Sequence, residues 1–251
     1  MEKYKEKSVY RILDEITACI TSIKKKLISE GFDGDKLELS LYGISAGAQL
    51  ILLYGLGYQG NDVIPIKYLM NAVGPVSCDL NYWYKPAINN GTFDEDIFIS
   101  VEELKKQIEA KTIIPIEPEF VVRIMNSMAG RIISQQQLDK LVVNGEVKTD
   151  SEDYKKIYSL AKYGFPIEVI KDNLLPMLCL YGGNDNLVGL MHYSYLKEAY
   201  EKNGGKDKIE LIYMQDAGHE RFYHGIQRDF DAMQRMHYKM VEYAKQYFTS
   251  D

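Results

Sequence analysis

Gly43-Ile44-Ser45-Ala46-Gly47 joins a predicted strand, residues 37–42, to a predicted helix that begins at Ala46. A Gly-x-Ser-x-Gly sequence between a strand and a helix is typical of a nucleophile elbow, a tight turn that lifts the serine hydroxyl out of the sheet. Because the turn is so tight, we expect both flanking positions, Gly43 and Gly47, to require the absence of a side chain. Ser45 is therefore the candidate nucleophile. The alternative is a glycine-serine turn that serves only close packing of the helix.

The residues on either side of this turn have the patterns that the two elements require. Residues 37–41 alternate between apolar and polar side chains, as a half-buried strand does. Residues 46–54 begin with small side chains and continue with large apolar ones. This order predicts a helix that packs close beneath Ser45.

The composition predicts a soluble globular protein without a nucleic-acid surface. The chain has 251 residues, of which 46% are hydrophobic, enough to bury one core, or one core with a small inserted subdomain. Its net charge of −6 results from 30 basic and 36 acidic residues, and no basic stripe overrides it. Lys24-Lys25-Lys26 is interpreted as the solvated face of a helix.

The cysteines and the first residues favour a cytoplasmic location. Cys19, Cys78 and Cys179 are odd in number and lie in apolar stretches, so we expect buried free thiols rather than disulfides or a metal site. Residues 1–7 lack the apolar core of a signal peptide, and no apolar run reaches the ~18 residues of a membrane span.

Helical and strand patterns alternate along most of the chain, which predicts an α/β fold with a mostly parallel sheet flanked by helices. The expected elements are a helix at 9–30, a strand at 37–42, a helix from 46, strands at 67–73 and 177–181, a helix at 193–203, a strand at 208–214 and a helix at 226–248. Apolar stripes predict the buried faces of the first and last helices. They are Val9, Ile12, Leu13, Ile16, Ile20, Ile23 and Leu27 in the first, and Phe230, Met233, Val241 and Phe248 in the last.

Residues 79–165 interrupt this alternation, and we predict that they form a helical cap insertion. Helical stretches at 101–110 and 120–128 are separated by prolines and polar turns. Residues 1–78 and 166–251 then form the core domain.

Three polar residues follow predicted strands at their carboxyl ends, where parallel sheets carry their sites. They are Ser45, Asp185 and His219. A serine hydroxyl needs a histidine to take its proton and a buried carboxylate to orient that histidine. These residues supply each type of group.

Other residues remain candidates for the acid and the base. Asp79 follows the second strand and is the alternative acid, and Asp216 is a weaker one. Asp185 has a structural alternative as well, an Asx turn or a helix cap. Of the remaining histidines, His192 and His237 fall at predicted helices, where we expect surface or packing roles.

His224 raises the question of a metal site together with His219-Glu220. A zinc helix needs its two histidines four positions apart, so that they share one face. His219 and His224 are five positions apart, so the sequence argues against such a site.

Segments along nearly the whole chain carry a family resemblance. Besides the elbow, they are Tyr-Gly-Gly-Asn-Asp-Asn-Leu-Val at 181–188, Ala217-Gly218-His219 and the helix at 9–30. They resemble the acid loop, the histidine loop and the helix before the nucleophile strand of the α/β-hydrolase superfamily, in its esterase and lipase-like (carboxylesterase) branch. The order Ser, Asp, His along the chain is also that of the family.

The resemblance implies a partial α/β-hydrolase fold and a serine hydrolase of small carboxylic esters, which works through an acyl-enzyme on Ser45 without cofactor or metal. His219 would act as general base and then as general acid, and Asp185 would orient it. The backbone N–H of Ala46 would be one oxyanion-hole donor. Tyr82 and Trp83, in the insertion, would line the substrate pocket; the alternative is that they belong to the hydrophobic core, as most aromatic clusters do.

The chain departs from the family in its first part, because it lacks the amino-terminal strands and the His-Gly-Gly loop that completes the oxyanion hole. The strand carrying Ser45 then becomes an edge of the sheet, which invites pairing. We therefore expect an amino-terminally shortened hydrolase, the product of a split or misannotated gene, or a chain that pairs this edge with a second copy or another partner. Fewer oxyanion donors would weaken the isolated chain. The alternative functions are a non-catalytic or fragmentary module of this fold that binds a partner or ligand, and a peptidase or amidase.

Overall fold

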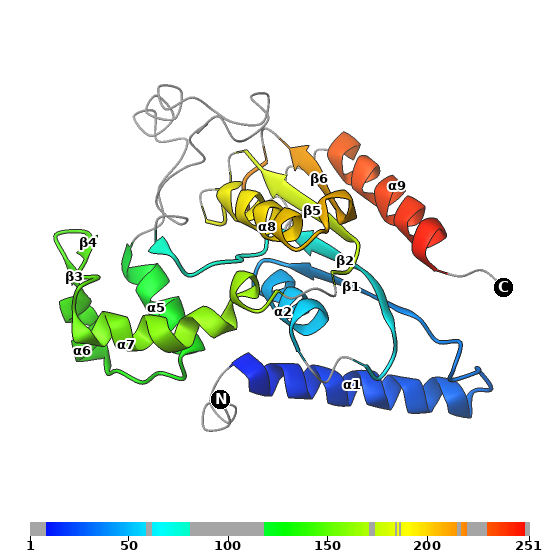
Figure 1. Cartoon of the computed structure of the whole chain (residues 1–251), viewed down its shortest axis with the longest axis horizontal. Coiled ribbons are helices and arrows are strands. Elements are labelled where there is room, and N and C mark those ends of the chain that lie inside the picture. Colours follow the sequence, from blue (N-terminus) through cyan, green and yellow to red (C-terminus); the bar gives the residue numbers. More distant parts are fainter. Residues whose placement is uncertain are drawn as a thin grey trace.

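A computed structural model describes residues 9–58, 62–80, 118–170, 174–183, 185, 187–214, 217–219 and 230–248, without the side chains of residues 230–233 and 235. Within this part, four strands form a parallel sheet in the order β1-β2-β5-β6 (Figure 1). The strands are β1 Leu39–Ile44, β2 Ile66–Ala72, β5 Met177–Gly182 and β6 Ile209–Met214. The predicted parallel sheet is confirmed, and β1 continues past its predicted end to meet the elbow directly.

The helices predicted from residues 9, 46, 120, 193 and 226 lie, where they are described, close to their predicted ranges, whereas α6 and α7 were not predicted individually. The helices are α1 Val9–Ser29, α2 Ala46–Leu56, α5 Pro118–Met128, α6 Gln135–Leu141, α7 Glu152–Ala161, α8 Met191–Lys202 and α9 Phe230–Tyr247, and the 3₁₀ turns are η3 Lys162–Gly164, η4 Pro166–Glu168 and η5 Lys206–Lys208. None of the helices in the described ranges is apolar over a length that would cross a membrane.

Strand β5 shows how the sheet is buried on both faces. Cys179 and Tyr181 pack with side chains of α2 and α8 on one face. Leu178 and Leu180 pack with side chains of α9 on the other. All six residues of β5 are buried, as is typical of an inner strand of a covered parallel sheet.

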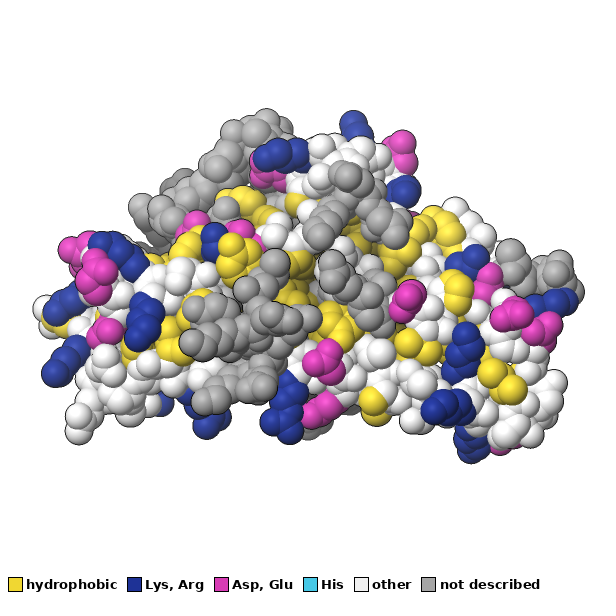
Figure 2. Space-filling view, turned by 60° about the horizontal axis from the view of Figure 1, so that its bottom comes forward, with side chains coloured by type: hydrophobic (Ala, Val, Ile, Leu, Met, Phe, Trp, Pro, Cys, Tyr) yellow, Lys and Arg dark blue, Asp and Glu magenta, His cyan; other side chains and the backbone are white. Residues whose placement is uncertain are grey.

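Helix α1 packs on α2 through a narrower face than its apolar stripe predicts. Leu13 and Ile20 are buried against α2, whereas Ile12 and Ile23 are 45% and 54% exposed. These two isoleucines lie on one margin of the stripe, beyond the surface that α2 offers. Figure 2 views the molecule from the α1 side and shows hydrophobic side chains at the surface among interspersed cations and anions.

Helix α9 also differs from its predicted face. Met236 and Tyr243 are buried, while Val241 is 50% exposed. Positions 236, 240, 243 and 247 recur at helical spacing and form the packed face. At ~100° per residue, Val241 lies about 130° from the centre of this face. Phe248 packs partly against this cluster as predicted, and the side chains of Phe230 and Met233 are outside the described part.

The three cysteines are free, and two of them match their predicted burial. Cys78 and Cys179 are buried, but Cys19 is exposed. Cys19 lies on α1 outside the cluster that packs on α2, so the prediction of a buried thiol is wrong there.

The region between β2 and β5 contains α5, α6, α7 and a small hairpin. Helix α5 confirms the helix predicted at 120–128, and the stretch at 101–110 lies outside the described residues. The hairpin pairs β3 (Val142–Val143) with β4 (Glu146–Val147) and was not expected from the sequence. Its turn residues Asn144 and Gly145 have φ of 53° and 78°, the left-handed values that an Asn-Gly hairpin turn needs.

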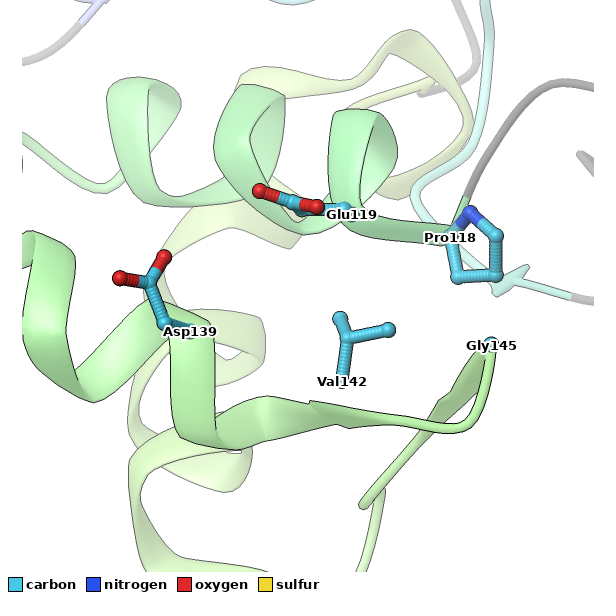
Figure 3. Close-up of a pocket in the computed structure, with 5 residues that line it drawn as sticks. All are labelled: Pro118, Glu119, Asp139, Val142 and Gly145. Atoms are coloured by element: carbon cyan, nitrogen blue, oxygen red, sulfur yellow. The ribbon is translucent and has the colours of Figure 1, made fainter.

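A groove of about 470 Å³ lies between α5, α6 and this hairpin (Figure 3). Pro118, Glu119, Asp139, Val142 and Gly145 line it. The two carboxylates already have partners, since Glu119 pairs with Arg123 and Asp139 accepts a hydrogen bond from Gln135. None of the predicted site residues that the structure describes lines this groove.

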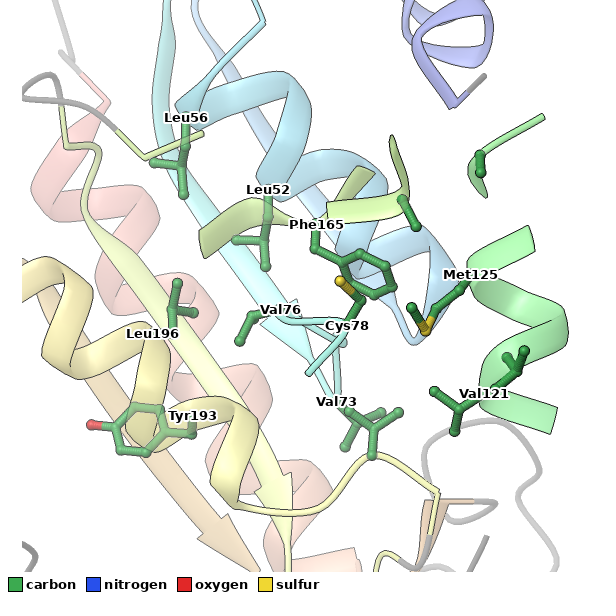
Figure 4. Close-up of a cluster of buried hydrophobic side chains, with 14 of the residues drawn as sticks. Leu52, Leu56, Val73, Val76, Cys78, Val121, Met125, Phe165, Tyr193 and Leu196 are labelled. Carbon is green, nitrogen blue, oxygen red and sulfur yellow. The ribbon is translucent and has the colours of Figure 1, made fainter. Parts of the chain in front are cut away.

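The helical region shares one hydrophobic cluster with the sheet (Figure 4). Val121 and Met125 of α5 belong to the same cluster as Leu52 of α2 and Val73 and Cys78 after β2. The division into a core of residues 1–78 and 166–251 and a cap of residues 79–165 stays a prediction.

Strand β1 is the terminal strand of the sheet among the strands that the structure describes, as predicted. Its inner edge bonds to the β2 side, where the N–H of Leu39 donates to Pro65 O. Tyr42 on this strand is 42% exposed. The pairing of this edge with a second copy or another partner stays a prediction.

Candidate active site

Ser45 sits at the point where β1 turns into α2, in a backbone conformation that few residues adopt. Its φ is 53° and its ψ −119°. The N–H of Ser45 donates to Ala72 O at the end of β2 (2.8 Å), and its carbonyl accepts the N–H of Gln49 in α2 (3.0 Å). Neighbouring strand and helix thus both hold the turn.

The two glycines of the elbow differ in what they permit. A Cβ at Gly43 would lie 2.4 Å from the carbonyl oxygen of Gly47, so Gly43 must be glycine. A Cβ at Gly47 would meet no described atom within 4 Å. The expectation that both positions exclude side chains therefore holds for Gly43 and is wrong for Gly47 in the described part.

The Ser45 hydroxyl contacts His219 instead of capping the helix. Serine at a helix N-cap usually accepts a backbone N–H with its side chain, but Ser45 makes no such bond. Its Oγ lies 3.0 Å from His219 Nε2, and His219 Nδ1 lies 2.8 Å from Asp185 Oδ2. The three residues that the sequence singled out, from three different strand ends, meet at one place.

This geometry selects one tautomer of the His219 imidazole. His219 and Asp185 are both buried, and the carboxylate can only accept a hydrogen bond. The proton of neutral His219 therefore belongs on Nδ1, where it is donated to Asp185. Nε2 is left as an acceptor for the Ser45 hydroxyl, which is the state that a general base requires.

The two oxygens of Asp185 serve two purposes. Oδ2 accepts from His219, and Oδ1 accepts the backbone N–H groups of Leu187 (2.9 Å) and Val188 (2.8 Å). The turn-forming alternative that the sequence left open is therefore realised together with the contact to His219. The turn locks the carboxylate in the orientation that faces the imidazole.

The other histidines lie apart from this contact or outside the description. His192 is buried, and its Nδ1 accepts the N–H of Val76 (3.1 Å). Burial lowers the pKa of His192 to about 3, so it is neutral at pH 7. His237 is exposed on α9, and His224 is outside the described residues.

The structure describes only some of the remaining predicted site residues. Asp79 is described, and its N–H donates to Ser77 Oγ, while Asp216 is not described. Ala46 is the first residue of α2, directly after Ser45, as an oxyanion donor must be. Tyr82 and Trp83 lie outside the described residues.

Two buried polar residues near the elbow were not predicted. Asn71 lies in β2 and Tyr181 in β5, and the side-chain Nδ2 of Asn71 donates to the hydroxyl of Tyr181 (3.1 Å). Burial raises the pKa of Tyr181 well above its ordinary value, and the nearby charge of Asp185 adds to this. The available signal was Asn71 itself, an amide in an otherwise apolar run at the end of β2.

Comparisons with known proteins find likeness in structure alone. No protein-family model matches the chain, and no curated protein matches it. Butyrate-bound esterase Est2 of the planctomycete Thermogutta terrifontis matches with a TM-score of 0.52 and 15% identity, over 97% of this chain and 69% of that one. The same esterase phosphonylated by sarin gives a TM-score of 0.53, also at 15% identity and with the same coverage.

A second kind of hydrolase has a comparable likeness. The acetyl ester-xyloside bifunctional hydrolase of Caldicellulosiruptor lactoaceticus matches with a TM-score of 0.50 and 12% identity, over 94% of this chain and 66% of that one. Identities this low show a shared fold and leave activity open. Together with the parallel sheet and the Ser45 elbow, these likenesses show that the chain has the α/β-hydrolase fold in the form seen in esterases.

Proposed function

We propose that the chain is a serine hydrolase of carboxylic esters that uses Ser45, His219 and Asp185 as its triad. The observation that carries the proposal is the continuous set of contacts from Ser45 Oγ through the imidazole of His219 to the buried carboxylate of Asp185. The esterase neighbours support this choice at the level of the fold.

In the proposed reaction, Ser45 Oγ attacks the acyl carbon of the ester while His219 Nε2 takes the hydroxyl proton. The tetrahedral intermediate collapses, and the proton passes from His219 to the leaving alkoxide, which departs as the alcohol. A water molecule then gives a proton to His219 Nε2 as its oxygen attacks the acyl carbon of the acyl-enzyme. This second tetrahedral intermediate collapses, His219 returns the proton to Ser45 Oγ, and the carboxylic acid leaves. Asp185 stabilises the imidazolium and takes no proton itself.

The oxyanion of the tetrahedral intermediate needs hydrogen-bond donors, and the N–H of Ala46 is the proposed one. Loss of a single such donor costs roughly 10²- to 10³-fold in rate. Ala46 is the one donor assigned among the described residues, so a non-catalytic module with the same fold is the alternative function. A peptidase or amidase of this fold is a further alternative. Short acyl esters are the proposed substrates, with support from the butyrate that the Thermogutta esterase binds.

A fluorophosphonate probe tests the proposal directly. We expect the probe to modify Ser45, as located by mass spectrometry of the digested protein, because the activated hydroxyl attacks phosphorus as it would attack an ester carbonyl. His219→Ala removes the base and should abolish labelling. His237→Ala, a change to an exposed histidine on α9, is the matched control and should label like the wild type.

A folded wild-type protein that does not react with the probe would sink the proposal and favour the binding module. Circular dichroism confirms folding of each sample. If Ser45 is labelled, hydrolysis of p-nitrophenyl acetate, butyrate and octanoate compared with the matching anilides separates an esterase from an amidase. Faster turnover of the anilides would contradict the ester assignment.

A further inference from the structure

The segment after β2 contains a backbone conformation that the reaction described above does not explain. Val73 has a φ of 47°, in the left-handed region, although it is β-branched and fully buried. Such residues rarely adopt this conformation unless their surroundings enforce it, and they concentrate near functional sites. The contacts around Val73 must therefore enforce this conformation.

A closed ring of hydrogen bonds fixes the next residue, Gly74. The N–H of Gly74 donates to Asn71 Oδ1 (2.9 Å), Asn71 Nδ2 donates to the hydroxyl of Tyr181 (3.1 Å), and that hydroxyl donates to Gly74 O (2.6 Å). Asn71 and Tyr181 are both 0% exposed. Side chains of β2 and β5 thus bind both the N–H and the carbonyl oxygen of Gly74.

The same segment carries the nucleophile elbow. The peptide between Ala72 and Val73 accepts the N–H of Ser45 at Ala72 O (2.8 Å) and donates its own N–H to Leu180 O (2.9 Å). The orientation of this peptide therefore sets where the backbone of Ser45 lies relative to β5.

Gly74 also touches the helix that follows Ser45. A Cβ at Gly74 would lie 2.7 Å from Cβ of Ala48 in α2 and 2.4 Å from Asn71 Oδ1. The ring and the first turn of α2 are in close contact, so a shift of Gly74 displaces the elbow.

We propose that Tyr181 and Asn71 are positioning residues that hold Ser45 at the correct distance from His219 through the Gly74 turn. This inference rests on the proposed hydrolase function. Neither residue has to touch substrate, because their effect passes through the Ala72–Val73 peptide and the contact of Gly74 with Ala48. Small misplacements of a reacting group cost up to about 10²-fold in rate.

Tyr181→Phe tests the proposal, with Tyr200→Phe as a matched control. The hydroxyl of Tyr200 is also on a fully buried ring and donates to a backbone carbonyl, Leu175 O (3.0 Å), but at the amino end of β5. Both variants lose one buried hydroxyl, so both lose stability. Only Tyr181→Phe should also slow fluorophosphonate labelling of Ser45, by roughly tenfold or more.

Steady-state kinetics separate a positioning role from a loss of stability. They use the p-nitrophenyl ester that the wild-type protein hydrolyses fastest. We expect Tyr181→Phe to lower kcat with KM within about twofold, measured at a temperature where circular dichroism shows full folding. The pH at which kcat/KM falls on the acid side should stay unchanged, because the contact of His219 with Asp185 is untouched. Asn71→Ala should give a similar loss, and the double variant Asn71→Ala/Tyr181→Phe should be no slower than either single one.

Wild-type labelling rates in Tyr181→Phe would overturn the inference, and so would equal slowing in Tyr200→Phe, which would indicate a general loss of stability. If Tyr181→Phe fails to fold, the labelling rate of Asn71→Ala is compared with that of Tyr200→Phe instead. A folded wild-type protein that is not labelled would overturn the proposed function and this inference with it, whereas labelled wild type with unaffected variants overturns the inference alone.

Discussion

The two sides of the candidate site are held by different means. On the Ser45 side, Ser45 and Val73 both have left-handed φ, of 53° and 47°, each at a cost on the order of 1–3 kcal/mol. On the Asp185 side, no described residue from 181 to 190 or from 217 to 219 has a positive φ. There the carboxylate is placed by ordinary turn hydrogen bonds from Leu187 and Val188.

This difference has consequences for substitution. A strained backbone persists only while its neighbours enforce it, so changes on the Ser45 side should alter stability and chemistry together. On the Asp185 side the turn is unstrained and is held by Oδ1, so replacing Oδ2, which contacts His219, should leave the turn intact. Changes there should affect chemistry with little effect on folding.

The largest expected effect is that of Gly43→Ala, compared with Gly47→Ala. The Cβ of Ala at position 43 would lie 2.4 Å from Gly47 O, a backbone atom that cannot move without opening the elbow. We expect complete loss of probe labelling and an unfolding midpoint in urea well below that of the wild type. Gly47→Ala should fold normally and gain up to ~1 kcal/mol, since alanine favours helices. Similar results for both variants would contradict the role assigned to Gly43.

The next effect is that of Asp185→Asn. The Asn Oδ1 can keep both turn N–H groups, so the variant should fold, but its NH₂ would face His219 Nδ1. His219 would then carry its proton on Nε2 and could not accept from Ser45. We expect kcat/KM to fall on the order of 10³- to 10⁴-fold with an unchanged urea midpoint.

Asp79→Asn is the control for this change, because Asp79 is the alternative acid from the sequence. We expect it to retain activity within about twofold. If Asp79→Asn costs as much as Asp185→Asn, the assignment of the acid is wrong.

The smallest expected effect is on the pH dependence of stability and involves His192. This residue of α8, the helix that follows the Asp185 loop, accepts the N–H of Val76, which lies in the segment after β2. The pKa of His192 is lowered from 6.5 to about 3, so between these values the unfolded chain binds a proton that the native state does not. Stability therefore falls as pH drops from 6.5 towards 3, by up to ~1.4 kcal/mol per pH unit from this group.

His192→Asn removes this titration and keeps an acceptor for the Val76 N–H. Urea denaturation between pH 7 and pH 4 should show a shallower loss of stability for this variant than for the wild type. His237→Gln, on the exposed surface of α9, should follow the wild-type curve. Parallel curves for His192→Asn and the wild type would argue against a neutral buried His192.

Much of the fold and of the candidate site follows from local sequence. The Gly-x-Ser-x-Gly turn, the apolar strands and the polar residue after each strand are local signals, and parallel strands bring their carboxyl ends together. The contact of Ser45, Asp185 and His219 could therefore be anticipated without knowledge of the sheet order.

What could not be anticipated depends on contacts between distant segments. Asn71 and Tyr181 are 110 positions apart, and only the pairing of β2 with β5 makes them neighbours. The exposure of Ile12 and Val241 depends on how wide a surface α2 and the sheet offer to each helix. Gly47 differs from Gly43 because of the path of α2, which the pentapeptide does not contain.

The contact between Ser45 and His219 spans 174 positions of the chain. During synthesis, Ser45 leaves the ribosome long before His219, and His219 lies directly beyond β6, so the contact needs β6 to join the sheet. Pairings between such distant segments form late and slowly. Under the proposed mechanism, a growing or incompletely folded chain would therefore carry an inert serine, and reactivity with the fluorophosphonate would report, molecule by molecule, that folding has finished.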